Sequence, residues 1–286
     1  MEIGKGTKVF ITGAASGIGR STALAAAGLG ARLFLTDINR DGLDRTAALV
    51  AGRPGEVCMA RVMDISEEEQ VRRFAEDIHA KYGPMDVVMN IAGIALFAQI
   101  EDMTHAQWKK VIDVNLWGPI HVLQSFVPAM IRADKAGHIV NVASVAGLMG
   151  APWHAAYSAS KAGLVGMSEA LFFDLRPHGI GVTVVCPGGV DTPLQDTVAI
   201  LGADKNSARF TELKKFFGRH AISPDAVASQ IVKAVQRKKF LVITSADVRF
   251  GYFFKHHVPP LYRAIMFRIA GLLNSLKRAD NGPSEK

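Results

Sequence analysis

The sequence predicts a doubly wound α/β domain, in which a parallel sheet of about seven strands carries helices on both faces. Short apolar segments of strand length alternate with longer segments of helical periodicity. This alternation is typical of a parallel sheet built from strand–helix–strand units. Right-handed crossovers between such units distribute the helices over both faces of one sheet. No repeat of fixed period interrupts the pattern, which favours a single domain followed by a tail.

The elements can be assigned in order along the first 245 residues. The predicted strands are Lys8–Thr12, Arg32–Thr36, Val57–Met63, Asp86–Asn90, His138–Ala143, Gly181–Cys186 and Phe240–Ile243. Helices are predicted to begin at Gly17, Asp41, Ser66, Thr104, near Leu116, at Ala155 and at Ser223. Two of these positions have start signals, because Ser66 and Glu69 have the spacing of a capping box and Ser223 precedes a proline.

Composition indicates an ordinary globular chain. Hydrophobic residues make up 49% and charged residues 21% of the 286 positions, the opposite of a disordered chain. The N-terminus runs directly into a strand without the apolar segment of a signal peptide, so we expect a cytoplasmic protein. Cys58 and Cys186 are therefore expected to be free, buried thiols.

The net charge of +7 is concentrated in the C-terminal third of the chain. Residues 1–204 carry 17 basic and 21 acidic side chains, whereas residues 205–286 carry 16 and 5. A solvated surface with some anion steering explains this excess, and a membrane surface is the alternative. Nucleic acid is not expected as a partner, because the basic residues alternate with long apolar stretches and no recognition motif accompanies them.

A strand that turns through three glycines into a helix predicts a dinucleotide site. Gly13 permits the tight turn, Gly17 lets the backbone approach a pyrophosphate, and Gly19 lets helix and strand pack closely. The helix N-terminus then presents unpaired N–H groups and partial positive charge to the anion. The residues assigned to this turn are Gly13, Ser16, Gly17, Ile18 and Gly19.

An acidic residue at the end of the second strand favours NAD over NADP. Asp37 can accept hydrogen bonds from the adenosine ribose and would repel a 2′-phosphate. No basic residue lies within the glycine turn, and Ile38 rather than an arginine follows Asp37. Asp64, at the end of the third strand, is placed to contact the adenine edge, or else it only caps the next helix. NAD is the expected cofactor, with NADP as the alternative.

Tyr157 and Lys161 are four residues apart, so they are neighbours on one face of a helix. Hydride transfer to a ketone requires a proton donor, and the reverse reaction requires a base. An unperturbed tyrosine, with a pKa of about 10, is a poor base at neutral pH. An ammonium roughly 4 Å away would favour the phenolate by about 4 kcal/mol at an effective dielectric constant near 20. We therefore expect Lys161 to lower the pKa of Tyr157.

Two more polar residues, Ser144 and Asn115, join Tyr157 and Lys161 as candidate site residues. Ser144 ends a predicted strand where its hydroxyl can reach a substrate oxygen, and Asn115 precedes the helix expected near Leu116. With these motifs in this order, residues 5–245 resemble the short-chain dehydrogenase/reductase family, whose fold is Rossmann-like. The matching positions are Thr12–Gly19, Asn115, Ser144, Tyr157, Lys161 and Pro187–Thr192.

The resemblance implies a catalytic role for four of these residues. Tyr157 would be the general acid and base, and Lys161 would lower its pKa and hydrogen-bond the nicotinamide ribose. Ser144 would orient and polarise the substrate oxygen. Asn115 would hold a water molecule in a proton relay towards Lys161.

The resemblance also implies further cofactor contacts after the fourth and sixth predicted strands. These contacts are Asn90, Ala92, Gly93, Pro187, Gly188, Val190 and Thr192. Val190 and Thr192 would close over the nicotinamide carboxamide. The family's usual Asn-Asn-Ala-Gly turn has Ile91 at its second position here, and we expect altered local hydrogen bonding without loss of binding.

Substrate choice in the family is usually made after Thr192. Residues 193–218 mix apolar and basic side chains and are expected to form helices, either as a flap over the active site or as a plain cover. Trp153 and His154 lie on the expected substrate side of Tyr157. His154 is expected to be a pocket or surface residue rather than a second base.

Residues 247–286 form a basic, amphipathic C-terminal extension to the catalytic domain, residues 1–246. No window of 18 apolar residues lacks charge, so the extension is not expected to span a bilayer. It packs on the domain or a subunit partner, lies on an anionic membrane, or covers a lipophilic substrate. No metal is expected, because the adjacent His256 and His257 have no acidic or cysteine cluster beside them. The apolar face of the extension comprises Leu261, Ile265, Ile269, Leu272 and Leu276.

The sequence thus predicts an NAD-dependent oxidoreductase that transfers a hydride between the nicotinamide and an alcohol or ketone. The apolar flap and extension favour a steroid, a retinoid-like molecule or a long-chain alcohol as substrate. An NADPH-dependent ketone reductase is the alternative enzyme, and a dinucleotide-sensing or membrane-bound scaffold is the alternative outside enzymes. By resemblance we expect a homodimer or homotetramer, formed through the helices near residues 116–133 and 155–177.

Overall fold

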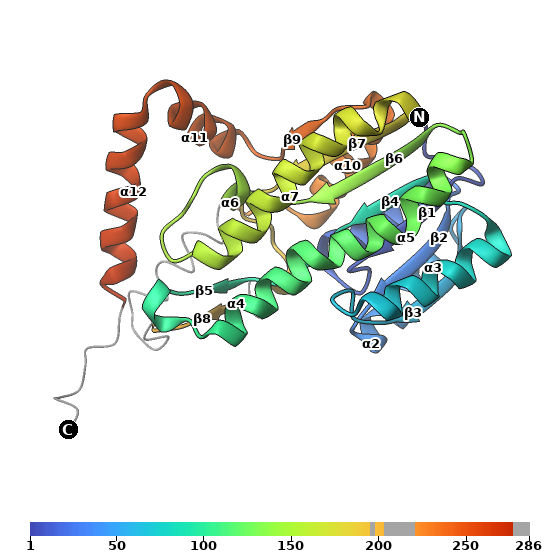
Figure 1. Cartoon of the computed structure of the whole chain (residues 1–286), viewed down its shortest axis with the longest axis horizontal. Helices are drawn as coiled ribbons and strands as arrows, with labels where there is room; N and C mark the ends of the chain where they lie inside the picture. The colour runs from blue at the N-terminus through green and yellow to red at the C-terminus, as the bar shows by residue number, and fades with distance from the viewer. Residues whose placement is uncertain (195–197, 203–220, 277–286) are drawn as a thin grey trace.

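The computed structural model describes residues 1–194, 198–202 and 221–276. Seven parallel strands form one sheet in the order β3-β2-β1-β4-β6-β7-β9 (Figure 1). The strand order reverses between β1 and β4, so the predicted doubly wound fold class is confirmed. The strands are β1 (Lys8–Thr12), β2 (Arg32–Asp37), β3 (Glu56–Val62), β4 (Val87–Asn90), β6 (Gly137–Val142), β7 (Ile180–Cys186) and β9 (Leu241–Ile243).

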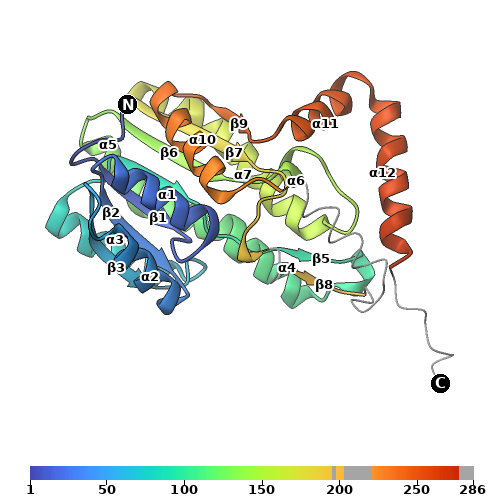
Figure 2. The same ribbon diagram turned by 180° about the vertical axis from the view of Figure 1, so that it is seen from behind.

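Helices cover both faces of this sheet (Figures 1 and 2). One face carries α1 (Gly17–Gly28), α2 (Arg40–Val50) and α10 (Pro224–Arg237). The other face carries α3 (Glu68–Tyr82), α5 (Gly118–Arg132) and α7 (Ala155–Asp174). Because successive side chains of a strand point to opposite faces, Ile11 of β1 enters the first apolar core and Phe10 enters the second. In the second core the rings of Phe10 and Phe126 lie 4.4 Å apart between centroids.

Every predicted strand matches the observed one to within one residue at each end. The capping box predicted at Ser66 and Glu69 is wrong, because α3 begins two residues later, at Glu68. Oδ1 of Asp64 accepts hydrogen bonds from both the Ser66 amide, at 2.9 Å, and the Ser66 hydroxyl, at 2.7 Å. Glu69 is paired with Arg72 instead. Asp64 therefore caps a turn in this structure, and its contact with adenine stays a prediction.

The connection from β4 to α5 contains elements that the sequence does not predict. A two-stranded parallel sheet pairs β5 (Leu96–Phe97) with β8 (Ala199–Ile200). The helix predicted near Leu116 begins later, at Gly118, after a π-helical turn over Asp113–Trp117. The helix predicted to begin at Thr104 is confirmed as α4 (His105–Ile112), with Thr104 as its N-cap. The remaining short elements are η1 (Ile100–Asp102), α6 (Val145–Leu148) and η3 (Arg176–His178). The flap predicted at residues 193–218 lies largely outside the described residues.

The C-terminal extension forms two helices, α11 (Ala246–His257) and α12 (Pro259–Asn274), which project from one end of the domain (Figures 1 and 2). The C-terminal end of α12 returns to the domain, where Leu276 packs on Trp153. Most of the predicted apolar face remains exposed: Leu261, Ile265 and Leu272 are 44%, 43% and 57% exposed. Among the described residues no helix combines the length and the apolar character that crossing a bilayer requires.

Candidate active site

The carboxyl ends of β1, β4, β6 and β7 meet at one edge of the sheet. The reversal of strand order between β1 and β4 opens a crevice at this edge, which is where doubly wound sheets bind ligands. The glycine turn follows β1, and Ser144 and the segment Pro187–Thr192 follow β6 and β7. The fold therefore gathers motifs at this edge that are far apart in the sequence.

The glycine turn leaves no room for side chains. A Cβ on Gly19 would lie 2.0 Å from the carbonyl oxygen of Gly13, and a Cβ on Gly13 would lie 2.8 Å from the backbone of Ala92. Gly13 and Gly17 also have positive φ angles of 71° and 48°. The backbone at the N-terminus of α1 is consequently bare, as an anion-binding turn requires.

Thr12 joins the glycine turn to the turn after β4. Its hydroxyl accepts hydrogen bonds from the amides of Ile91, at 3.0 Å, and Ala92, at 3.1 Å. The Ile91 side chain packs against the apolar core beside α1. Ile91, at the position where the Asn-Asn-Ala-Gly pattern has its second asparagine, thus packs an apolar side chain against an apolar surface.

The carboxylate of Asp37 is fixed beside the glycine turn. Oδ2 accepts a hydrogen bond from the Ala15 amide and Oδ1 accepts one from the Asn39 amide, both at 2.9 Å. The neighbouring Arg20 guanidinium donates to the hydroxyl of Thr46, at 3.1 Å, and to the Ala15 carbonyl. The Asp37 carboxylate is therefore held in one orientation beside the turn. The Arg20 guanidinium makes its hydrogen bonds to other groups.

Asn115 is buried within the π-helical turn and connects two parts of the site. Its Nδ2 donates to the Ile94 carbonyl, at 2.9 Å, and to the Ser160 hydroxyl, at 3.2 Å. Its Oδ1 accepts from the Ile94 amide, at 2.9 Å. The side chain thereby fastens the segment after β4 to α7, and the predicted water relay stays a prediction.

Lys161 places an ammonium group inside the protein. The residue is buried, and its Nζ donates a hydrogen bond of 3.0 Å to the carbonyl of Val142, the last residue of β6. A Cβ on Gly93 would lie 3.2 Å from this nitrogen, so a larger residue there would crowd the ammonium. Burial lowers the pKa of Lys161 to about 8, because leaving water destabilises the charged form.

The phenol of Tyr157 is hydrogen-bonded to the Ser144 hydroxyl, and its ring lies near the ammonium of Lys161. Burial raises the pKa of Tyr157, and hydrogen bonding with the Ser144 hydroxyl opposes that rise. The direction differs from the expectation that Lys161 lowers this pKa. Nζ of Lys161 lies 5.9 Å from the centre of the Tyr157 ring and donates to the Val142 carbonyl, so the loss of water around the phenolate dominates.

Three aromatic rings form a wall beside the phenol. The Phe97 ring stacks on His154, with centroids 3.8 Å apart, and the Tyr157 ring lies edge-on to both, at 5.8 and 6.4 Å. Burial lowers the pKa of His154, which favours a neutral ring and fits a pocket residue. Sequence reasoning missed Phe97, because β5 exists only through its pairing with β8, about a hundred residues later.

The segment Pro187–Thr192 lies between the glycine turn and the C-terminal extension. A Cβ on Gly17 would be 2.9 Å from Cγ2 of Thr192, so the threonine methyl rests on the glycine turn. At the other end of the segment, a Cβ on Gly188 would be 2.7 Å from Cγ2 of Val248 in α11. The segment is therefore placed to cover the inner part of the crevice.

These residues fit a bound dinucleotide. The glycine turn is a cradle that any Cβ would fill. Oδ1 of Asn90, at the end of β4, is buried without a hydrogen-bond partner, although Nδ2 of the same residue donates to Asn141 at 2.9 Å. A buried acceptor of this kind is free to accept a hydrogen bond from a bound molecule. Within the described ranges, no group of three or more His, Cys, Asp or Glu side chains could hold a metal ion.

Comparisons with known proteins point to one family. The family model described as short chain dehydrogenase matches residues 7–200. The probable oxidoreductase EphD of Mycobacterium bovis is 37% identical over 237 residues, covering 82% of this chain and 40% of that protein. The chain therefore spans about two fifths of the length of that relative.

A second relative and a solved structure match over nearly their whole length. The 3-oxoacyl-[acyl-carrier-protein] reductase FabG of Thermotoga maritima is 38% identical over 229 residues, covering 80% of this chain and 89% of that protein. A short chain dehydrogenase/reductase from Burkholderia phymatum, solved in complex with NAD, is 28% identical with a TM-score of 0.79. That alignment covers 91% of this chain and 96% of the other.

Proposed function

The chain belongs to the short-chain dehydrogenase family, and on that premise we propose that it is an NAD-dependent enzyme that interconverts an alcohol and a ketone. The observation that carries the proposal is the convergence of Ser144, Tyr157 and a buried Lys161 beside the glycine turn. The bound nicotinamide would accept the hydride during oxidation and donate it during reduction.

The described residues offer a place for each part of the dinucleotide. The pyrophosphate would lie on the bare backbone between Gly13 and Gly19, and Asp37 would accept hydrogen bonds from the adenosine ribose. The ammonium of Lys161 would hydrogen-bond the nicotinamide ribose. Val190 and Thr192 would face the carboxamide from the segment after β7.

The chain's own side chains would handle the proton. During reduction, Oη of Tyr157 gives its proton to the oxygen of the ketone, and the Ser144 hydroxyl donates a hydrogen bond to the same oxygen. The ammonium of Lys161 then stabilises the phenolate that remains. During oxidation, the same phenolate takes the proton of the alcohol. The stacked rings of Phe97 and His154 would form an apolar wall beside the reacting oxygen.

Tyr157→Phe tests this assignment, because it removes only the phenol oxygen. We expect turnover to fall by about 100-fold or more, since general acid–base catalysis contributes about 10²–10⁴-fold, while the Kd for NAD stays within a factor of two or so. NADH absorbance with a panel of alcohols measures turnover, and calorimetry measures the Kd. Tyr82→Phe is the matched control. Tyr82 is the last residue of α3, and its phenol donates to the carbonyl of Cys58 in β3 rather than to a residue of the site. Near-normal turnover in Tyr157→Phe would refute the role of the phenol.

We propose NAD rather than NADP as the cofactor because of the charge at Asp37. Both carboxylate oxygens accept backbone hydrogen bonds, so the charge cannot turn away from a 2′-phosphate at low cost. The Arg20 guanidinium, which contacts the glycine turn, donates hydrogen bonds to the Thr46 hydroxyl and to the Ala15 carbonyl.

Replacing Asp37 with serine should therefore narrow the preference for NAD. Hydrogen bonds to charged groups contribute about 1.5–3 kcal/mol, so we expect Asp37→Ser to weaken NAD binding by roughly 10- to 100-fold. Binding of NADP should improve at the same time, because the repulsion is removed. Titration of both nucleotides measures this, with Asp41→Ser in the exposed first turn of α2 as the control. An unchanged ratio of the two affinities in Asp37→Ser would contradict the proposal.

We propose in addition that α11 and α12 bind an anionic membrane surface. Half of the large apolar side chains that are exposed in the described residues lie on these two helices or at Val258, which joins them. Residues 246–276 carry four lysines and arginines but only one acid, Asp247. Charge complementarity favours anionic lipid over a second copy of this surface, since two positive surfaces repel each other. The exposed side chains are Phe250, Phe253, Val258, Leu261, Ile265, Phe267 and Leu272.

Vesicle flotation tests this surface. The protein should float with phosphatidylcholine vesicles that contain phosphatidylglycerol, and less with phosphatidylcholine alone or at high salt. The double variant Phe253→Ser, Phe267→Ser should lower recovery several-fold, whereas Leu49→Ser, at an exposed apolar residue of α2, should not. Equal recovery of wild type and double variant would exclude the membrane role, as would a loss of subunit association in the double variant.

A further inference from the structure

The C-terminal extension holds the segment that joins the serine and the tyrosine of the candidate site, residues 145–156. The hydroxyl of Tyr262 in α12 donates a hydrogen bond to the carbonyl of Gly150, at 3.1 Å. Nζ of Lys255 in α11 donates one to the carbonyl of Leu148, at 2.5 Å. Each of the two helices thus fixes one backbone carbonyl of this segment.

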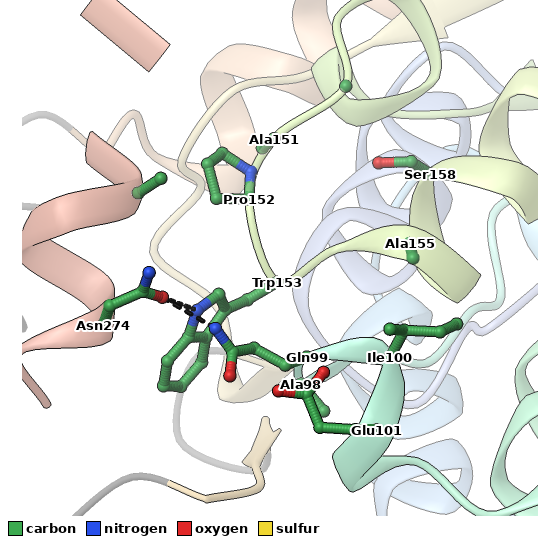
Figure 3. A pocket seen from close by; sticks show the side chains of 12 residues that line it. Ala98, Gln99, Ile100, Glu101, Ala151, Pro152, Trp153, Ala155, Ser158 and Asn274 are labelled. Atoms are coloured by element: carbon green, nitrogen blue, oxygen red, sulfur yellow. Dashed lines mark hydrogen bonds between the residues drawn. The ribbon is translucent and has the colours of Figure 1, made fainter. Parts of the chain in front are cut away.

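Asn274, the last residue of α12, makes a third and more extensive contact. Its Oδ1 accepts hydrogen bonds from the indole N–H of Trp153, at 3.0 Å, and from the side-chain amide of Gln99, at 2.8 Å (Figure 3). An indole N–H can only donate, so Asn274 has to present its oxygen here. Leu276 packs on the same tryptophan, whose side chain is buried.

The two donors belong to the two segments that carry the rings beside the phenol. One donor lies two residues after Phe97, and the other directly precedes His154. The Ala98 amide donates to the Trp153 carbonyl, at 2.7 Å, and Ala98 and His154 form a parallel β-bridge. Across this bridge the rings of Phe97 and His154 stack, with centroids 3.8 Å apart. Asn274 therefore binds both sides of the bridge that brings the two rings together.

The backbone of Trp153 needs such support. Its φ of 65° is unfavourable for a residue with a bulky side chain. Residues in this region of φ persist only where the surrounding structure holds them there. His154, the N-cap of α7, follows directly, so the backbone of Trp153 sets the direction in which the chain enters the helix. Because Tyr157 lies in the first turn of α7, a change at Trp153 would move the phenol as well.

We propose that Asn274 is a positioning residue for Tyr157, which it holds in place through Trp153 and the start of α7. Through the β-bridge it also holds the rings of Phe97 and His154 at the phenol. The proposal rests on the proposed function, because it takes Tyr157 as the proton donor. The end of the C-terminal extension is then needed for the geometry of the active site.

Asn274→Leu tests the proposal, because it keeps the approximate size of the side chain and removes the acceptor. We expect kcat to fall about tenfold, since a misplacement of about 1 Å can cost about 100-fold in rate. The Kd for NAD should stay within a factor of about two, because the contacts of Asn274 involve no residue of the glycine turn. Asn274→Asp keeps an acceptor oxygen and should restore most of kcat.

Ser275→Ala is the matched control at the same end of α12. Its hydroxyl donates to the Leu272 carbonyl within the extension, so this variant loses a hydrogen bond that does not reach the domain. It should keep the wild-type kcat. Trp153→Phe removes the donor of the proposed hydrogen bond and should reproduce the loss seen in Asn274→Leu, which gives a second test if one variant folds poorly.

Nuclear magnetic resonance of protein labelled at the tyrosine rings gives a readout that is independent of turnover. The Tyr157 signals, assigned by their loss in Tyr157→Phe, depend on the nearby rings of Phe97 and His154. We expect these signals to shift in Asn274→Leu and to keep their wild-type positions in Asn274→Asp and Ser275→Ala.

Wild-type kcat and wild-type Tyr157 signals in Asn274→Leu would overturn the positioning role. So would a lowered melting temperature with unchanged kcat, because Asn274 would then only stabilise the fold. Absence of turnover with every alcohol in the wild type would overturn the proposed function instead, and the Tyr157 signals would still decide whether Asn274 positions the phenol.

Discussion

The candidate site depends on a charge that the fold removes from water, the ammonium of Lys161. Helix α7 carries it to the carboxyl end of the sheet, where the Val142 carbonyl accepts its hydrogen bond and Gly93 leaves the space it needs. Its pKa falls from 10.5 to about 8, which corresponds to about 3 kcal/mol of unfavourable free energy in the protonated form. Because the unfolded chain holds this proton more tightly, the cost is complete below about pH 8 and fades as the pH rises towards 10.5. The two apolar cores on either side of the sheet must offset it.

Burial shifts the pKa values of Tyr157 and Lys161 in opposite directions. It raises the pKa of Tyr157 and lowers that of Lys161, because each group is driven towards its neutral form. At neutral pH the phenol therefore holds its proton and the amine remains largely charged. In the proposed mechanism such a phenol would protonate a ketone oxygen, and the buried ammonium would be the nearby cation for the phenolate that results. The proposed chemistry thus follows from where the protein excludes water as well as from the spacing of the two residues.

Local patterns in the sequence account for the main sheet but not for the surroundings of the site. The strands are short runs rich in apolar residues, and the positions predicted for them agree with the structure to within a residue at each end. The pairing of Phe97 in β5 with β8 has no such signal, because two-residue strands show no periodicity and their partners are distant in the chain. The hydrogen bonds of Asn274 to Trp153 and Gln99 likewise arise only from tertiary packing. The helical character of α12 could be predicted, whereas the exposure of its apolar face depends on how the helix leaves the domain.

A pH titration of the Lys161 amine would show whether the fold removes this charge from water. Nuclear magnetic resonance of protein labelled at the lysine side chains would follow it, with the signal assigned by its loss in Lys161→Met. A buried Lys161 amine should titrate with a midpoint near pH 8, well below that of a solvated lysine. A midpoint near 10.5 would show a hydrated ammonium, and it would contradict the buried charge on which the proposed proton transfer depends.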